Sequence, residues 1–102
     1  MNTTVRIKIT KKPRRGWSCT TYILHPDWPR EVMTHTGHGT LKSTLWHTIL
    51  DCMDLGASLT ETKVKGKLMP NAEIYQRVHD ALAGGTLRYR LPAIREYLEV
   101  TP

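Results

Sequence analysis

The spacing of apolar residues changes along this chain, and the change limits the folds that it can adopt. Near the N-terminus, Val5, Ile7 and Ile9 alternate with polar residues, which is typical of a half-buried strand. After Thr40, apolar residues recur at the spacing of one helical face. Strand-like and helix-like segments then alternate toward the C-terminus. This succession predicts an α/β (mixed α+β) fold built on one sheet.

The expected element order is β-β-β-α-β-α-β-α, in a single domain that spans residues 1–102. Strands are expected over residues 5–10, 17–24, 31–36, 60–68 and 86–91. Helices should begin near residues 40–43, 71 and 92, and glycines at 56 and 84 should end the first two. The leading strands should form an antiparallel three-stranded meander. The later strand–helix units should extend the same sheet, with the helices packed on it.

Length and cysteine content indicate a single cytoplasmic domain. A chain of 102 residues fits one domain of common size, and no apolar run approaches the roughly 20 residues of a membrane-spanning helix. Cys19 and Cys52 are too few for a disulfide framework, so we expect both thiols to be reduced and buried. The N-terminal residues contain no hydrophobic signal core. We therefore expect neither membrane contact nor secretion by the usual route.

The positive charge of the chain is concentrated at its N-terminus. The formal net charge is +6, from 15 Lys and Arg residues against 9 Asp and Glu residues. Six of the basic residues, and none of the acidic ones, lie within residues 1–16, so the rest of the chain is neutral overall. A concentrated positive patch attracts polyanions more strongly than a diffuse excess does. The charge distribution therefore favours a polyanionic partner.

Most of these charges lie on a predicted β-hairpin tip, where Pro13 and Gly16 mark a turn between the first two strands. Cations on a protruding turn can reach phosphates and release counterions, and a nearby indole can stack on an exposed base. We therefore expect a nucleic-acid-binding surface. Its predicted residues are Arg6, Lys8, Lys11, Lys12, Arg14, Arg15, Trp17 and Lys42. The alternative is a solvated turn with Trp17 in the core.

Three further features each have a functional and a structural interpretation. Basic residues that alternate in two later strands form a secondary basic surface, or they protect an edge strand from pairing. They are Lys63, Lys65, Lys67, Arg88 and Arg90. The turn Gly37–Ser43, which includes Lys42, is either an anion seat at a helix start or a connection capped by Thr40 or Ser43. Trp28, which lies between two prolines, either forms a protein interface or packs over the end of the sheet.

The five histidines form no recognisable metal or catalytic motif. They are His25, His35, His38, His47 and His79. The cysteines lack the C-x-x-C spacing of zinc sites, and His38–Leu41 fits only one of the two H-x-T elements that two-histidine phosphoesterases need. We therefore expect no metal, no cofactor and no catalytic residue. A phosphodiester-cleaving enzyme that uses His35, His38 and Asp51 is a third hypothesis.

The predicted order of strands and helices resembles the ribonuclease H-like fold, over residues 4–91. The resemblance implies a scaffold on which carboxylates from the first strand, the first helix and the end of the fourth strand hold two metal ions. Here the first strand has no acidic residue, and the fourth ends in Lys65-Gly66-Lys67-Leu68. Asp51 and Asp54 lie in the second half of the first helix. The resemblance therefore implies the scaffold without its catalytic carboxylates.

Residues 5–56 also resemble a double-stranded RNA-binding domain. In that family three strands lead into a helix whose glycine-rich, basic start grips phosphates. The corresponding residues here are Gly37-His38-Gly39-Thr40-Leu41-Lys42-Ser43. The helix that precedes the first strand in that family is absent, and Lys42 stands alone where the family has a cluster of lysines.

These observations favour non-catalytic binding of nucleic acid (DNA or RNA), or of a nucleoprotein complex, through the basic hairpin. The alternative is a small accessory protein of a phage or mobile element that inhibits a host defence complex by protein–protein binding, as anti-CRISPR proteins do. In that case the hairpin would dock on an acidic protein surface or cover a guide-RNA site. The sequence leaves the partner's identity and the oligomeric state open.

Overall fold

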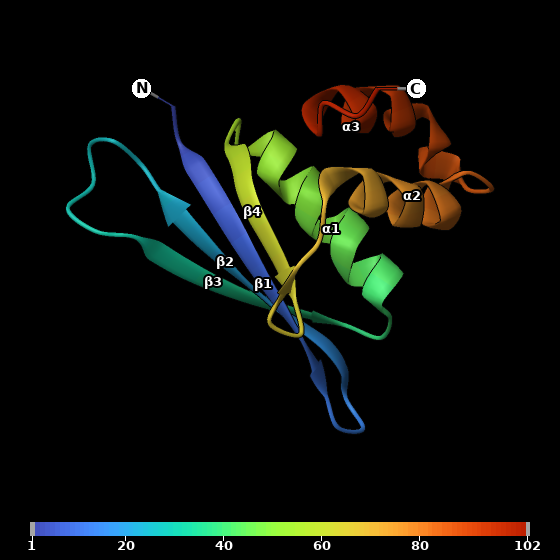
Figure 1. Cartoon of the computed structure of the whole chain (residues 1–102), viewed down its shortest axis with the longest axis horizontal. Coiled ribbons are helices and arrows are strands. Elements are labelled where there is room, and N and C mark those ends of the chain that lie inside the picture. Colours follow the sequence, from blue (N-terminus) through green and yellow to red (C-terminus); the bar gives the residue numbers. More distant parts are fainter. Residues whose placement is uncertain (1, 102) are drawn as a thin grey trace.

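The computed structural model describes residues 2–101 and arranges them as one sheet with its helices on one side (Figure 1). The strands are β1 (Thr4–Lys12), β2 (Gly16–Leu24), β3 (Val32–His38), β4 (Ser58–Val64) and β5 (Lys67–Leu68). The helices are α1 (Leu41–Asp54), α2 (Asn71–Leu82), the 3₁₀ helix η1 (Thr86–Arg90) and α3 (Leu91–Tyr97). Within the described residues no helix covers the opposite face, which we call the open face.

The strand order across the sheet is β3-β2-β1-β4-β5. β1 pairs with β2, and β2 with β3, in the antiparallel orientation, so the predicted meander is confirmed. β4 lies parallel to β1, as the change to strand–helix alternation predicts. The chain therefore returns through α1 to the centre of the sheet. This connection leaves β3 at one edge and the short β5 at the other.

The predicted α/β class with a mixed sheet is confirmed, but its fifth strand lies elsewhere than expected. The strand predicted over residues 60–68 is interrupted by a turn at Lys65 and Gly66, with φ angles of 53° and 79°, and the chain then returns as β5. Residues 86–91 form η1 and the first residue of α3 instead of a strand. Within residues 2–101, α2 is therefore followed by no strand, whereas the ribonuclease H-like order requires one there.

The core lies between the sheet and the helix layer. Alternate residues of β1 and one face of α1 meet there, in agreement with the two apolar spacings of the sequence. Each of the following side chains is at most 2% exposed: Val5, Ile7, Ile9, Leu45, Ile49 and Cys52. Cys19 of β2 is buried in the same cluster, and both thiols are free, as expected. The sheet is thus anchored on one face only.

The two buried thiols of Cys19 and Cys52 should make the stability of the fold fall at alkaline pH. Burial raises the pKa of Cys52 from 9.0 to about 12 and also raises the pKa of Cys19, because a thiolate is poorly solvated there. Above pH 9 the unfolded chain loses thiol protons that the folded chain keeps, so the free energy of unfolding falls as the pH rises toward 12. Between pH 8 and pH 10.5 we expect the ionisation of Cys52 alone to lower the free energy of unfolding by about 2 kcal/mol.

Urea unfolding at several pH values, with a reductant present, measures this effect. Cys52→Ala should be less stable than the wild type at pH 8, because it removes a buried side chain. Its stability should then decline less steeply as the pH rises. An equally steep decline in both proteins would show that ionisation of Cys52 does not cause the alkaline loss.

Candidate nucleic-acid interface

The β1–β2 hairpin carries its basic residues on a tip that projects beyond the other strands (Figure 1). β1 and β2 stay paired as far as Lys12 and Gly16, whereas pairing with β3 and β4 stops earlier on the tip side. The turn closes through a 3.3 Å hydrogen bond from Arg15 N–H to the Lys12 carbonyl, and Arg14 has a φ of 59°. All of residues 11–15 are exposed, and within residues 2–101 none of their cations forms an ion pair. The four predicted cations therefore have no ion-pair partner among the described residues.

Trp17 lies at the base of this tip and is half-buried. The Nζ atoms of Lys11 and Lys65 lie 5.4 Å and 5.5 Å from the centre of its ring. The indole also packs against the edge of the core and lines a hollow of about 350 Å³ beside Leu41 and Met69. The core-packing interpretation of Trp17 therefore holds in part, and base stacking stays a prediction.

The open face of the sheet adds a pair of lysines that extends the charge of the hairpin. Lys8 of β1 is the register partner of Lys63 of β4, and Thr20 and His35 continue the same row through β2 and β3. Like charges placed directly opposite each other destabilise a sheet. Within the described residues, neither lysine has a carboxylate partner. The pair therefore adds two positive charges to the open face, next to Glu61, which is the register partner of Arg6.

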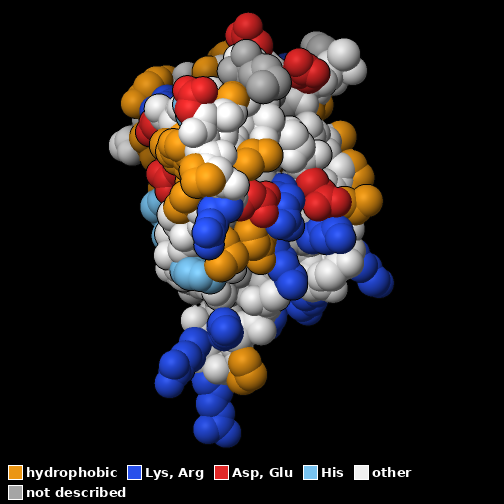
Figure 2. Space-filling view, turned by 90° about the vertical axis from the view of Figure 1, so that its left-hand side faces the viewer, with side chains coloured by type: hydrophobic (Ala, Val, Ile, Leu, Met, Phe, Trp, Pro, Cys, Tyr) orange, Lys and Arg blue, Asp and Glu red, His pale blue; other side chains and the backbone are white. Residues whose placement is uncertain are grey.

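Figure 2 shows the side of the molecule that is turned away from the helices. Lys and Arg side chains gather across its lower half and on the hairpin that projects below it, and the upper part carries more acidic side chains. Lys and Arg side chains therefore gather along this side of the molecule, from the tip of the hairpin upward.

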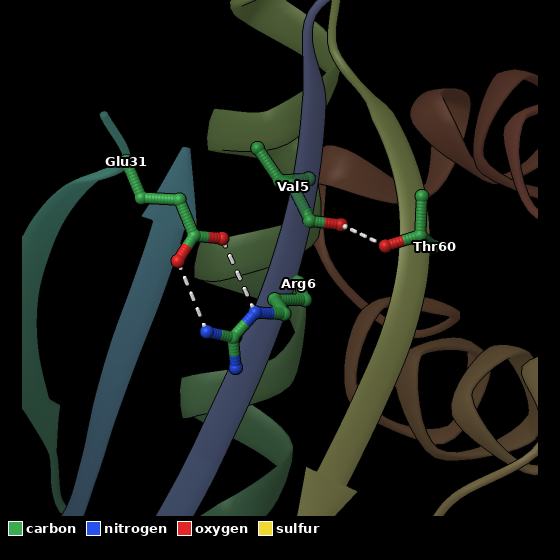
Figure 3. Close-up of polar contacts among 4 residues, drawn as sticks. All are labelled: Val5, Arg6, Glu31 and Thr60. Atoms are coloured by element: carbon green, nitrogen blue, oxygen red, sulfur yellow. Dashed lines mark hydrogen bonds and ion pairs between the residues drawn. The ribbon is translucent and has the colours of Figure 1, made fainter. Parts of the chain in front are cut away.

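Arg6 differs from the other predicted binding residues because its charge is already compensated. Its Nε and Nη2 donate to the two carboxylate oxygens of Glu31, at 3.3 Å and 3.1 Å (Figure 3). Its guanidinium also lies 3.9 Å from the centre of the Tyr22 ring. The hydrogen bond to Glu31 raises the pKa of Arg6. This arrangement ties the β2–β3 loop to the centre of the sheet and leaves Arg6 less available to an external anion.

The remaining predicted basic residues are dispersed. Lys42 is exposed in the first turn of α1, and Thr40 caps that helix by accepting a 3.0 Å hydrogen bond from Ser43 N–H, which confirms the capped-connection interpretation. The other five lie at three places. Lys63 faces the open side, Lys65 lies in the β4–β5 turn with Lys67 directly after it, and Arg88 and Arg90 belong to η1 on the helix layer.

The structure separates His35 from His38, which the phosphodiester-cleaving hypothesis places in one site. His35 and His38 are three residues apart in β3, so their side chains leave opposite faces of the strand. His35 Nδ1 is 3.1 Å from Thr20 Oγ1, whereas His38 stacks on His47 with 4.1 Å between ring centres. Burial lowers the pKa of His47, and the facing His38 lowers it further. Within residues 2–101, no three His, Cys, Asp or Glu side chains gather as a metal site would require.

Trp28 belongs to the exposed β2–β3 loop and is 42% accessible. Its ring lies 5.1 Å from that of His25, which in turn accepts a 3.0 Å hydrogen bond from Asp27 N–H. Leu24, Val32 and Met33 are other exposed large apolar residues of the chain that lie around the same end of β2 and β3. This apolar group lies at the opposite end of the strands from the basic hairpin.

Comparison of the chain with protein families, curated proteins and solved structures returned no match. Among the described residues, no helix has both the length and the apolar character needed to cross a membrane.

Proposed function

We propose that this protein binds nucleic acid, free or within a nucleoprotein complex, through its basic hairpin and the adjoining open face, without catalysis. One observation carries the proposal: the exposed cations of the hairpin tip and the Lys8–Lys63 pair of the open face have no carboxylate partners in residues 2–101. Proteins rarely keep unpaired like charges side by side on a sheet, because the repulsion costs stability. A phosphate backbone would remove that cost and release its own counterions.

The chemistry of this surface favours contacts to the backbone of the nucleic acid over contacts to bases. Lysine is a flexible point charge, and arginine can hold a phosphate through two parallel hydrogen bonds. Trp17 is engaged with the core edge and two lysines, so base stacking is a smaller contribution. We therefore expect binding that depends steeply on salt and little on sequence.

A fluorescence-anisotropy titration with labelled single- and double-stranded DNA and RNA tests this proposal. Binding to at least one probe that weakens with salt supports it, and the order of affinities identifies the preferred nucleic acid. Binding to none of the four at low salt would overturn it. Capture of a purified nucleoprotein complex without binding to free nucleic acid would instead favour the accessory-protein alternative. The proposed setting is the cytoplasm, where the free thiols of Cys19 and Cys52 would stay reduced.

Releasing Arg6 from its partner should strengthen binding. Glu31→Gln keeps the shape of the side chain and removes the carboxylate that neutralises the guanidinium. We expect the affinity for nucleic acid to rise about three- to tenfold at low salt, because one more cation becomes available to a phosphate. The same titration measures the change.

Asp27→Asn provides the matched control. It makes the same change in net charge within the same loop, but Asp27 is exposed and pairs only loosely with His25, at 3.8 Å. We expect a smaller gain, from the general field alone. Equal gains in the two variants would show that Arg6 does not contact the ligand.

A further inference from the structure

The β3 edge lacks the devices by which proteins usually protect an exposed strand. Its seven residues, Val32–His38, include no proline and no Lys, Arg, Asp or Glu. Its register with β2 runs without a bulge. Six of the seven residues are exposed, and only His38, at the end of the strand, is half-buried, against His47 of α1. Charges, prolines, bulges and short length are the features that normally prevent an edge from pairing with another chain.

The other edge of the same sheet shows the contrast. β5 has only two residues and begins with a lysine, and the turn before it contributes Lys65. A short, cationic edge resists pairing with another strand. The molecule therefore protects one edge and leaves the other ready for a partner.

We propose that the partner at the β3 edge is a second copy of this chain, paired antiparallel through β3. An antiparallel pair of identical strands has a two-fold axis perpendicular to the sheet, so a single strand supplies both halves of the contact. A pairing centred on His35 overlaps all seven residues. It places the 57% exposed Met33 of one copy opposite Gly37 of the other, where no side chain competes for space.

The charge distribution favours this occupant. The excess positive charge of +6 lies within residues 1–16, and β3 itself is uncharged, so pairing at β3 does not bring like-charged side chains of two copies together. The hairpin tip lies beyond the His38 end of β3, since His38 pairs with Trp17. The two-fold axis reverses the second strand and therefore places the two tips at opposite ends of the assembly. The helices of both copies stay on the same side, so the two open faces form one continuous surface.

Sedimentation velocity over a range of protein concentrations tests the proposal. The wild-type protein should move from monomer to dimer as its concentration rises. In the double variant Met33→Lys/His35→Lys, four lysines surround the two-fold axis on the open face, and we expect a monomer at every concentration. Circular dichroism verifies that the variant is folded. As a second measurement on the wild type alone, β3 amides should exchange with solvent more slowly at high protein concentration.

The control variant Leu68→Lys/Tyr89→Lys adds the same charge at two exposed apolar positions away from β3, which are 67% and 69% accessible. It should still form the dimer. A monomeric wild type up to the concentrations used for NMR would overturn the proposal. So would a dimer that persists in the β3 variant, or one that the control variant also loses. These outcomes do not depend on whether nucleic acid binds, so the two proposals fail separately.

Discussion

A variant with alanine at Lys11, Lys12, Arg14 and Arg15 is expected to bind nucleic acid about 100- to 1000-fold more weakly than the wild type in about 0.1 M salt. Each cation that meets a phosphate releases condensed counterions, and at this salt concentration each release contributes roughly 1 kcal/mol. The four side chains are exposed, so their removal leaves the core intact. Fluorescence anisotropy with the preferred probe measures the loss, and thermal unfolding should be nearly unchanged.

The control for this variant removes the same charge elsewhere. Alanine at Arg30, Arg77, Arg88 and Arg90 also deletes four cations, three of them on the helix layer and one in the β2–β3 loop. If binding follows net charge alone, the two variants will weaken equally. We expect the fold-loss of affinity in the control to be less than a tenth of the fold-loss in the hairpin variant, because only the long-range electrostatic field changes.

Gly16→Ala is expected to be the most destabilising single substitution at the hairpin, at about 3–4 kcal/mol. Gly16 has a φ of +77°, which an L side chain adopts only at a cost. A Cβ there would also lie 2.5 Å from the His38 carbonyl oxygen and 2.9 Å from Gly39 Cα. Both neighbours are backbone atoms, so the hairpin base or the connection from β3 to α1 must move. Urea unfolding at neutral pH measures the loss.

Gly66→Ala separates the cost of a positive φ angle from the cost of a steric clash with neighbouring backbone. Gly66 has nearly the same φ, +79°, but a Cβ at that position would meet nothing within 4 Å. We expect only the conformational cost of about 1 kcal/mol. Equal losses at the two glycines would mean that the close approach of Gly16 to His38 and Gly39 does not constrain the fold.

Local patterns predict the first half of this fold well. The alternation of Val5, Ile7 and Ile9 matches a strand that is buried on one face, and the apolar stripe of residues 45–52 matches the buried face of α1. The segment of residues 87–91 is less informative, because five residues can fit both the alternation of a strand and the spacing of a helix. Leu87 and Leu91 alternate with Arg88 and Arg90, yet they also lie one helical turn apart. The structure uses that second spacing and leaves Tyr89 exposed.

The candidate interface is predictable only where it is local. The hairpin tip lies within five consecutive residues, so the sequence alone indicates both its turn and its charge. The Lys8–Lys63 pair joins residues that are distant in sequence, and it requires knowing that β4 lies beside β1. Arg6 appears free in the sequence, but Glu31, 25 residues away, returns to neutralise it. Pairings between distant segments depend on sheet topology, which apolar spacing does not specify.

The salt dependence of binding tests the central claim most directly. We would measure the affinity of the wild type and of the four-alanine hairpin variant for the same labelled probe at several salt concentrations. For the wild type on duplex, the logarithm of the affinity should fall against the logarithm of salt with a slope of about −4 to −5, which corresponds to roughly five phosphates. The variant should show a slope shallower by about 3 to 4. The same slope in both proteins, or no binding at low salt, would contradict a nucleic-acid-binding role for the hairpin.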